Sequence, residues 1–214
     1  MKELPISLII PTLNEKENFS KVKNNIELLN SKEVFIVDGN SSDKTISTFS
    51  SLRKGIIISA PSRGIQLHLG AKNAKENWFL FMHADTLLNN KNIKDINQFI
   101  NKKNYKKVGY FKIRFDSTSI SAQIISYWAY IRTVLLKLPF GDQCLLIHRN
   151  YYQEIGGFSP IPTMEDLDFI LKIPKKNKFL FNSAVQTSFR KYQENGVFKQ
   201  CCKNIINQIK FLIN

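Results

Sequence analysis

The sequence has few cysteines and no recognisable linker. Three cysteines occur among 214 residues, and the adjacent pair Cys201 and Cys202 has neither zinc-ligand spacing nor the arrangement of a structural disulfide. This usage is typical of a reducing compartment. The first apolar run stops at Pro11, which indicates a strand and not a signal peptide, so we expect a cytoplasmic protein. No stretch rich in Pro, Gly and Ser divides the chain, and we expect a single domain.

Acidic residues are scarce. The chain has 17 Asp and Glu against 31 Lys and Arg, and its formal charge of +14 would attract polyanions such as nucleotide diphosphates, nucleic acids or anionic lipids. Many lysines stand beside asparagines, for example in residues 101–107 and 175–178, a pattern typical of solvated loops. Because no nucleic-acid-binding motif accompanies the charge, we expect no nucleic acid partner.

Long uninterrupted hydrophobic runs are also missing. The most apolar segment, residues 120–138, contains Arg132 and Lys137 and is too short and too charged to predict a membrane span. We expect a helix there. Residues 108–115 alternate apolar and polar side chains and predict a half-exposed strand, and a further strand is expected at residues 144–148.

Short apolar runs that end in polar residues dominate the first half. Strands are predicted at residues 6–10, 34–37, 55–59 and 78–82, with helices at 16–30 and 63–76 between them. Alternating strands and helices indicate a parallel sheet of the nucleotide-binding type, in which ligands bind beyond the carboxyl ends of the strands. Glu15, Asp38 and Asp85 stand at three such ends. Polar loops after buried strands are the alternative explanation, but three aligned carboxylates favour a site.

Seven motifs in order extend this interpretation. The segments are PTLNE (11–15), VDGNSSDKT (37–45), PSRGIQLHLGA (61–71), FMHADT (81–86), PFGDQCLLIHR (139–149), GGF (156–158) and MEDLDF (164–169). Together they resemble the inverting family 2 glycosyltransferases of the GT-A fold. The likeness is greatest to a small bacterial subgroup found near selenium and arsenosugar genes.

The resemblance implies a GT-A-like α/β domain: a Rossmann-type, mostly parallel sheet flanked by helices. It places this domain at residues 1–198, with a nucleotide-binding half (1–90) and an acceptor half (91–198), followed by a C-terminal helix (199–214). It implies a metal-dependent inverting hexosyltransferase that moves a sugar from a nucleotide-sugar donor, a UDP-sugar foremost, to a small-molecule or lipid-like acceptor.

The resemblance also implies a donor-binding set. Its members are Pro11, Asn14, Glu15, Asp38, Arg63, Gln66, His83, Arg190 and Lys191. Asp38 is the candidate acceptor of a base N–H, whereas Asp43 is expected to be an ordinary helix cap. The alternative for Arg63 and Gln66 is a position on the solvent-exposed surface. For Arg190 and Lys191 the alternative is that they are ordinary basic residues at the end of a strand in a protein of high positive charge.

Asp85 is the candidate metal ligand. A carboxylate in a tight turn after a buried strand offers the hard oxygen that Mg²⁺ or Mn²⁺ prefers, and leaves room for a diphosphate. Many relatives carry Asp-x-Asp here, whereas this chain has His83-Ala84-Asp85. Imidazole is a poor ligand for Mg²⁺, so His83 is expected to contact the substrate or support the site.

The acceptor side is expected in the second half. The resemblance places Asp142 and Gln143 near the transferred sugar, although Gly-Asp is also ordinary turn chemistry. It assigns Asp166 the role of general base toward the acceptor hydroxyl, with Glu165 beside it. Carboxylates at the start of a helix also complement its dipole, which is the alternative for this motif.

The C-terminal segment 197–213 repeats apolar pairs at helical spacing, with Lys199, Lys203 and Lys210 bordering or opposing them. We expect this helix to pack on the domain; contact with the inner face of the plasma membrane or with a second copy are the alternatives. Two other functions stay open for the whole chain: a nucleotidyltransferase of related fold, and a noncatalytic basic module that binds membranes or nucleic acid.

Overall fold

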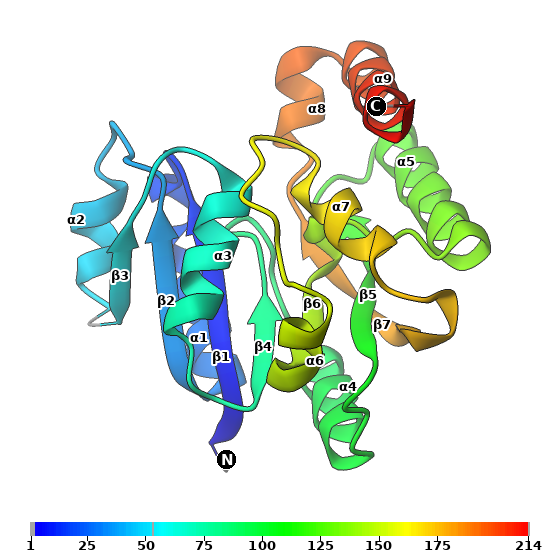
Figure 1. Cartoon of the computed structure of the whole chain (residues 1–214). Helices are drawn as coiled ribbons and strands as arrows, with labels where there is room; N and C mark the ends of the chain where they lie inside the picture. Colours follow the sequence, from blue (N-terminus) through cyan, green and yellow to red (C-terminus); the bar gives the residue numbers. More distant parts are fainter. Residues whose placement is uncertain (1–2, 53, 214) are drawn as a thin grey trace.

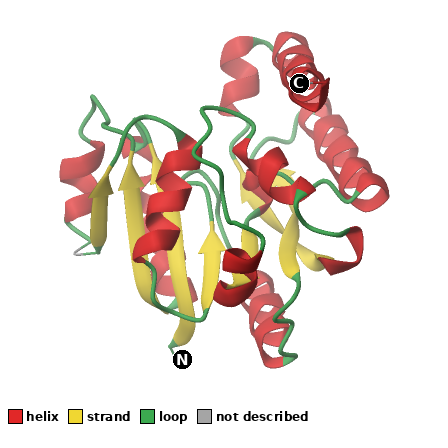
Figure 2. Cartoon of the chain, viewed as in Figure 1, coloured by secondary structure: helices red, strands yellow, loops and turns green. Residues whose placement is uncertain are grey.

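A seven-stranded sheet in the order β3-β2-β1-β4-β6-β5-β7 organises the protein, with helices on both faces (Figures 1 and 2). The computed structural model describes residues 3–52 and 54–213. The strands are β1 (Leu4–Thr12), β2 (Ser31–Asp38), β3 (Gly55–Ile58), β4 (Trp78–Phe81), β5 (Val108–Phe115), β6 (Leu145–His148) and β7 (Lys178–Thr187).

Nine α-helices are assigned in the described residues: α1 (Phe19–Leu29), α2 (Thr45–Ser50), α3 (Arg63–Asn73), α4 (Asn90–Asn101), α5 (Ile120–Ile131), α6 (Arg149–Glu154), α7 (Glu165–Leu171), α8 (Arg190–Asn195) and α9 (Val197–Ile213). Short helical turns add η1 (Lys16–Asn18), η2 (Arg132–Leu136), η3 (Gly141–Gln143) and η4 (Lys175–Asn177). The strands and helices predicted in the first half are therefore confirmed.

The first four strands run parallel, as predicted. β1 pairs with β2 on one side and β4 on the other, and β2 pairs with β3. β6 is antiparallel to β4 and to β5, while β5 and β7 are again parallel. The sheet is thus mostly parallel, and the carboxyl ends of β1, β2 and β4 meet at one edge.

Apolar side chains fill both faces of the sheet. On β1, Ile6, Leu8 and Ile10 face a core closed by α1 and α4, whereas Ile9 faces a second core closed by α3, α6 and α7. In Figure 1, α3, α6 and α7 lie in front of the sheet. Burial on both faces explains why the strand sequences are nearly continuous apolar runs.

Two predictions for the second half need correction. The strand at Val108–Phe115 is not half-exposed over its first four residues, because Val108 and Tyr110 face one apolar core and Phe111 faces the other. The helix expected over residues 120–138 is regular only to Ile131 and continues as the π-helical turn η2. Lys137 then adopts a left-handed conformation and Pro139 follows, which ends the helix.

Candidate active site

The site lies at the edge where β1, β2 and β4 end. Gly39 N–H donates to the Thr12 carbonyl (2.8 Å), and Met82 N–H donates to the Ile9 carbonyl (3.1 Å), so the chain leaves β2 and β4 against the end of β1. The loops that carry Glu15, Asp38 and Asp85 are thereby brought to one edge. This convergence is the arrangement that the strand pattern predicted.

Asp38 anchors this edge. Its carboxylate accepts hydrogen bonds from the Thr12 hydroxyl (2.8 Å), the Ser41 N–H (2.7 Å) and the Ser41 hydroxyl (2.7 Å), and the residue is 1% exposed. Both oxygens are therefore occupied by the protein. These bonds give Asp38 a bracing role that the sequence did not predict, and its contact with a base N–H stays a prediction.

Gln66 has a similar bracing role. Its side-chain amide donates to the carbonyls of Thr12 and Val37, each at 2.7 Å, and ties α3 to the ends of β1 and β2. The residue is 4% exposed, so the expectation that it faces an open crevice is wrong. The helical spacing predicted that Gln66 lies on the side of α3 that faces the strand ends. Only the packing shows that its amide N–H groups donate to the carbonyls of those strand ends.

The loop after β1 is held from the β2 side. Asn14 has a positive φ of 56°, and its side-chain Oδ1 accepts the Ser42 N–H at 2.9 Å. Glu15 accepts from the Asn18 amide (2.5 Å); burial raises its pKa, and nearby Asp85 raises it further. Pro11 lies buried in β1 at the start of this loop.

Asp43 caps α2 from the neighbouring position. The helix has Lys44 as its N-cap, but the Asp43 carboxylate accepts the Thr45 N–H at 2.8 Å and also the Thr45 hydroxyl. Asp43 thus acts at the start of the helix, as predicted, but it precedes the N-cap residue Lys44 by one position. The Thr45 hydroxyl in turn accepts the Glu15 N–H (2.8 Å), which connects the two loops.

Across the crevice, the start of α7 meets the start of α3. Arg63 Nη1 lies 3.2 Å from Glu165 Oε1, and Glu165 is buried whereas Arg63 is partly exposed. Burial raises the pKa of Glu165, and the Arg63 charge opposes that shift. Gly64 permits the approach, because a Cβ at this position would lie 2.5 Å from the Ser159 carbonyl. The sequence did not predict this contact between Arg63 and the MEDLDF motif.

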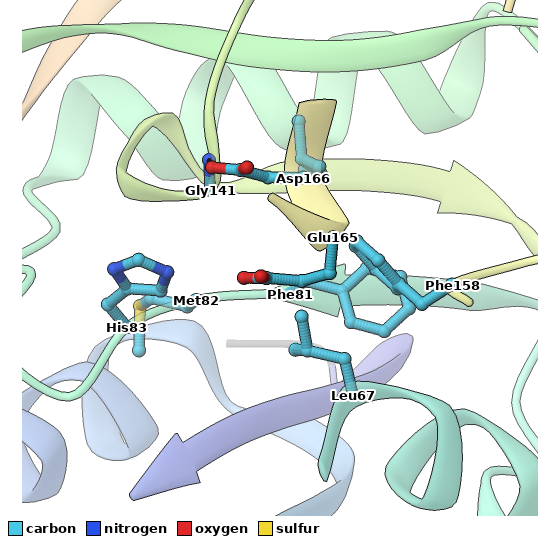
Figure 3. A pocket seen from close by; sticks show the side chains of 9 residues that line it. Leu67, Phe81, Met82, His83, Gly141, Phe158, Glu165 and Asp166 are labelled. Carbon is cyan, nitrogen blue, oxygen red and sulfur yellow. Dashed lines mark hydrogen bonds between the residues drawn. The ribbon is translucent and has the colours of Figure 1, made fainter. Parts of the chain in front are cut away.

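Asp166 holds the loop before β6. Its Oδ2 accepts the Gly141 N–H at 3.1 Å, and its Oδ1 accepts the Leu167 N–H at 2.8 Å. Figure 3 shows the Asp166 carboxylate beside Gly141, with Glu165 and His83 on the same pocket. A side chain at Gly141 would collide with His83, since its Cβ would lie 2.8 Å from His83 Nε2. The loop of Asp142 is thus pressed against the end of β4.

Several buried side-chain atoms in this region lack hydrogen-bond partners in the described residues: His83 Nε2, Asp85 Oδ1, Thr86 Oγ1, Arg132 Nε, Asp142 Oδ1 and Glu165 Oε1, the last of which forms the ion pair with Arg63. Burial lowers the pKa of His83 to about 3, with Arg63 and Lys191 adding to the shift, so the imidazole is neutral at pH 7. Burial also raises the pKa of Asp85 and takes that of Asp142 to about 6. A buried carboxylate oxygen without a donor is high in energy, and a cation would stabilise it.

Asp85 suits a divalent metal in this respect. Its free Oδ1 is a hard oxygen at the position that the sequence predicted, while its backbone carbonyl accepts from Lys21 Nζ at 3.3 Å. No cluster of three or more His, Cys, Asp or Glu side chains arranged for a metal occurs among the residues that the structure describes. The remaining ligands of a metal at Asp85 would therefore come largely from water and a bound diphosphate.

Gln143 proves to be a structural brace. Its Oε1 accepts from the Phe140 N–H and the Thr133 hydroxyl, both at 3.1 Å, and its amide donates to the Phe111 carbonyl at 2.7 Å. The residue is buried, so its predicted contact with the sugar would require these bonds to break. The neighbouring residue Asp142 keeps an oxygen without a hydrogen-bond partner, so it is the stronger candidate of the two for contact with the sugar.

The basic pair at the end of β7 lies at the rim. Arg190 Nη1 pairs with Glu17 Oε2 at 2.8 Å and its Nε lies 3.7 Å from Glu194 Oε1. Lys191 is exposed, yet its charge contributes to the lowered pKa of His83. Both cations are therefore near the crevice, and Arg190 is engaged with acidic partners.

Two cations near the site were missed by sequence reasoning. Arg132 stacks on the Phe140 ring at 3.5 Å from its centroid, and its charge opposes the raised pKa of Asp142. The sequence did offer a signal for Arg132, because it is one of only two charged residues in the apolar segment 120–138. Lys21, which reaches the Asp85 carbonyl and lies 3.6 Å from Asp116, carried no such signal among many lysines.

The raised pKa of Asp142 predicts a pH-dependent stability. The folded-state pKa of about 6 exceeds the ordinary value of 3.8, so stability is highest below the lower value and is lost as pH rises through the upper one. A shift of about two units corresponds to about 3 kcal/mol. Asp142→Asn should therefore raise the free energy of unfolding in urea at pH 7 by about 2–3 kcal/mol, with little gain near pH 4.

Asp43→Asn is the matched control for that experiment. Hydrogen bonds from Thr45 and Lys16 lower the pKa of Asp43, so its stabilising contribution is present at neutral pH and is lost as pH falls. The control should lose stability at pH 7. A gain in both variants, or in neither, would contradict the assignment of Asp142 as a destabilising buried carboxylate.

Known proteins and structures are similar to this protein over most of its length. The sequence profile described as Glycosyl transferase family 2 matches residues 7–149. Among solved structures, S. aureus TarS in complex with UDP is similar with a TM-score of 0.67 and 16% identity, over 86% of this chain and 60% of that one. The mannosyltransferase PcManGT from Pyrobaculum calidifontis, in complex with GDP-Man and Mn²⁺, gives 0.66 and 15%, over 87% and 57%.

A third similar structure is glucosyl-3-phosphoglycerate synthase from Mycobacterium tuberculosis, in complex with Mn²⁺, UDP and glucosyl-3-phosphoglycerate. Its TM-score is 0.58 at 14% identity, over 86% of this chain and 70% of that one. The chain spans less than two thirds of the length of the TarS and PcManGT structures. No curated protein matches the sequence. At these identities the structural likeness establishes the fold.

Proposed function

The chain belongs to glycosyl transferase family 2 and has the predicted GT-A fold, and from this premise we propose that it transfers a sugar from a nucleotide-sugar donor to an acceptor with inversion. The observation that carries the proposal is that Asp85 and Asp142 each keep one buried oxygen without a hydrogen-bond partner, in the same region as Asp166, whose charge acts on Asp142. Asp85 follows the parallel strand β4, at the edge where ligands of such sheets bind, and Asp142 lies in the loop before the antiparallel strand β6, which pairs with β4.

The donor would occupy the side of the crevice formed by the loops after β1 and β4. Arg63 and Lys191 add positive charge near His83, and the neutral imidazole of His83 is free to accept or donate one hydrogen bond. Asp85 would hold Mg²⁺ or Mn²⁺. When bound, such a metal neutralises charge on the diphosphate leaving group. The similar structures that contain UDP or GDP-Man with Mn²⁺ support this assignment.

Asp166 would act as the general base. In the proposed step, the acceptor hydroxyl loses its proton to Asp166 while its oxygen forms a bond to the anomeric carbon of the sugar. The bond from that carbon to the diphosphate oxygen breaks on the opposite face, and the electron pair leaves with the nucleoside diphosphate. Arg63, held by Glu165, would stabilise the charge that grows on the leaving group.

The finer assignments are also proposals. A hexose carried by UDP is the donor we favour, and the acceptor is a hydroxyl of a small metabolite or of a lipid-like molecule. The likeness to the selenium and arsenosugar subgroup rests on the motifs of this sequence, such as HADT at residues 83–86.

A thermal-shift screen tests the donor proposal directly. UDP-, GDP- and dTDP-sugars would be added to the purified protein with and without Mn²⁺, because a ligand that binds the native state raises its apparent stability. A ligand at 100 times its Kd should stabilise by about 2.7 kcal/mol. Mn²⁺-dependent stabilisation by one donor is the expected result. Absence of a shift with every donor would contradict the proposal and favour the noncatalytic basic module.

A further inference from the structure

Helix α9 lies on the domain with an unexpected orientation. Its contacts run through Val197 and through the amides of Gln200 and Asn204, which bond to each other (2.7 Å); Asn204 also donates to the Tyr192 hydroxyl (3.3 Å). Gln200 is 3% exposed, whereas Phe198 is 83% exposed. The helix packs on the domain, as expected, but of its apolar stripe Val197 contacts the domain while Phe198, Ile205 and Ile209 are exposed.

Helix α5 shows the same inversion. Its buried residues are small, Ala122 and Ala129, while Ile124 and Trp128 on the other side are more than half exposed. Leu135 in the π-helical turn extends this exposed side. Large apolar side chains in water are unfavourable, and a monomer rarely exposes many of them together unless they bind something.

The two helices are neighbours. Ala122 of α5, Val197 of α9 and Phe189 belong to one small apolar cluster, and Figure 1 shows both helices at the same end of the molecule. We call their exposed apolar side the α5–α9 face and represent it by Ile124, Trp128, Leu135, Phe198, Ile205 and Ile209.

The charge around this face has one sign. The sequence contains no Asp or Glu between Asp116 and Asp142, and none after Glu194. Lys137, Lys199, Lys203 and Lys210 lie in these stretches, and the three lysines of α9 are exposed. A second copy of the chain would bring lysines against lysines with no carboxylate on either helix. An anionic surface would instead satisfy both the apolar residues and the lysines.

We propose that the α5–α9 face docks the protein on an anionic lipid bilayer, with both helices lying in the interfacial region. Trp128, Tyr127 and Tyr130 suit the headgroup level, where aromatic side chains are enriched. None of the helices in the described ranges is long and apolar enough to cross a membrane, so the contact is peripheral. The π-helical turn leads directly to the loop of Asp142, and docking would set the candidate site beside the bilayer.

Sedimentation with vesicles tests the proposal. The full chain should sediment with phosphatidylcholine vesicles that contain phosphatidylglycerol, far less with pure phosphatidylcholine, and less as salt is added. Each basic residue near such a surface is worth about 1 kcal/mol, or about 5-fold in partitioning. Lys203→Gln with Lys210→Gln should therefore weaken binding about 25-fold. Equal binding to both kinds of vesicle would overturn the charge argument.

The apolar contribution needs its own variant. Ile205→Asp with Ile209→Asp should abolish sedimentation, whereas Ile58→Asp, an equally exposed isoleucine on the edge strand β3, should not. Binding should also shift the fluorescence of exposed Trp128 to shorter wavelength, and Trp128→Phe should remove this shift because Trp78 is buried. Vesicle binding that survives the double Asp substitution would overturn the proposal.

Two further measurements separate this proposal from others. If sedimentation velocity shows a dimer that the double Asp substitution dissociates, with no vesicle binding by the native chain, a second copy is the occupant and the lipid proposal fails. The Mn²⁺-dependent thermal shift with the donor should be unchanged in the double Asp variant. Failure of the donor proposal and failure of the membrane proposal are therefore distinguishable.

Discussion

Replacing Asp166 by Asn should lower kcat by about 10²–10⁴-fold, the range that a positioned general base contributes. Asn cannot take the proton of the acceptor hydroxyl, while its side-chain oxygen can still accept the N–H of Gly141 or Leu167. The rate of sugar transfer to the acceptor measures this effect, or the rate of transfer to water where that is detectable. The thermal shift produced by the donor measures donor binding in the same variant. Donor binding should change little.

Asp168→Asn is the control for this variant. Asp168 lies on the same helix two residues later, but its carboxylate pairs with Lys172 at 2.8 Å and accepts from the Ser159 hydroxyl at 2.7 Å, away from the pocket. Its loss should alter stability more than turnover. Full activity of the Asp166 variant, or equal loss in both variants, would remove Asp166 from the role of base.

Asp85→Ala should abolish the Mn²⁺-dependent part of donor binding, and a loss of at least about 100-fold in affinity is expected because even supporting residues of metal sites contribute 10–100-fold. The fold should survive. Burial raises the pKa of Asp85 and its Oδ1 has no partner, so removal of this carboxylate should not lower the free energy of unfolding. Calorimetric titration of UDP with and without Mn²⁺ measures the effect.

Two comparisons make the Asp85 result specific. Asp85→Asn keeps the shape of the side chain and one oxygen, and should retain part of the metal dependence. Glu27→Ala removes an exposed carboxylate that pairs with Lys23 on α1, and should leave titration unchanged. If Asp85→Ala binds the donor with undiminished Mn²⁺ dependence, the metal is held elsewhere.

The parallel half of the fold was predictable from local patterns. Apolar runs buried on both faces and helical spacing between them predicted β1, β2, β3 and β4, since periodicity is a property of neighbouring residues. The rule that ligands meet the carboxyl ends of parallel strands then brought Glu15, Asp38 and Asp85 to one edge. The exposure of strand β5 was misjudged because both of its faces are covered by residues far away in the sequence, those of α4 on one face and of α6 and α7 on the other.

The candidate site was predictable as a set of residues but not as a set of roles. Asp38, Gln66 and Gln143 look like ligands in the sequence, yet each forms hydrogen bonds within the protein, to distant residues in the case of Gln66 and Gln143 and to Thr12 and nearby Ser41 in the case of Asp38. Asp85 and Asp142 look no different from them and keep unpartnered oxygens. The distinction depends on which donors the fold brings within about 3 Å.

The residue pattern predicted the four parallel strands of the first half, and the motifs of adjacent residues indicated the family and the candidate carboxylates of the site. The tertiary structure decided which of those carboxylates are satisfied and which remain free, and it placed Arg132 beside Asp142. It also turned the amides of α9 inward and its isoleucines outward. A sequence pattern defines the faces of a helix, but only contacts between distant segments choose the face that is buried.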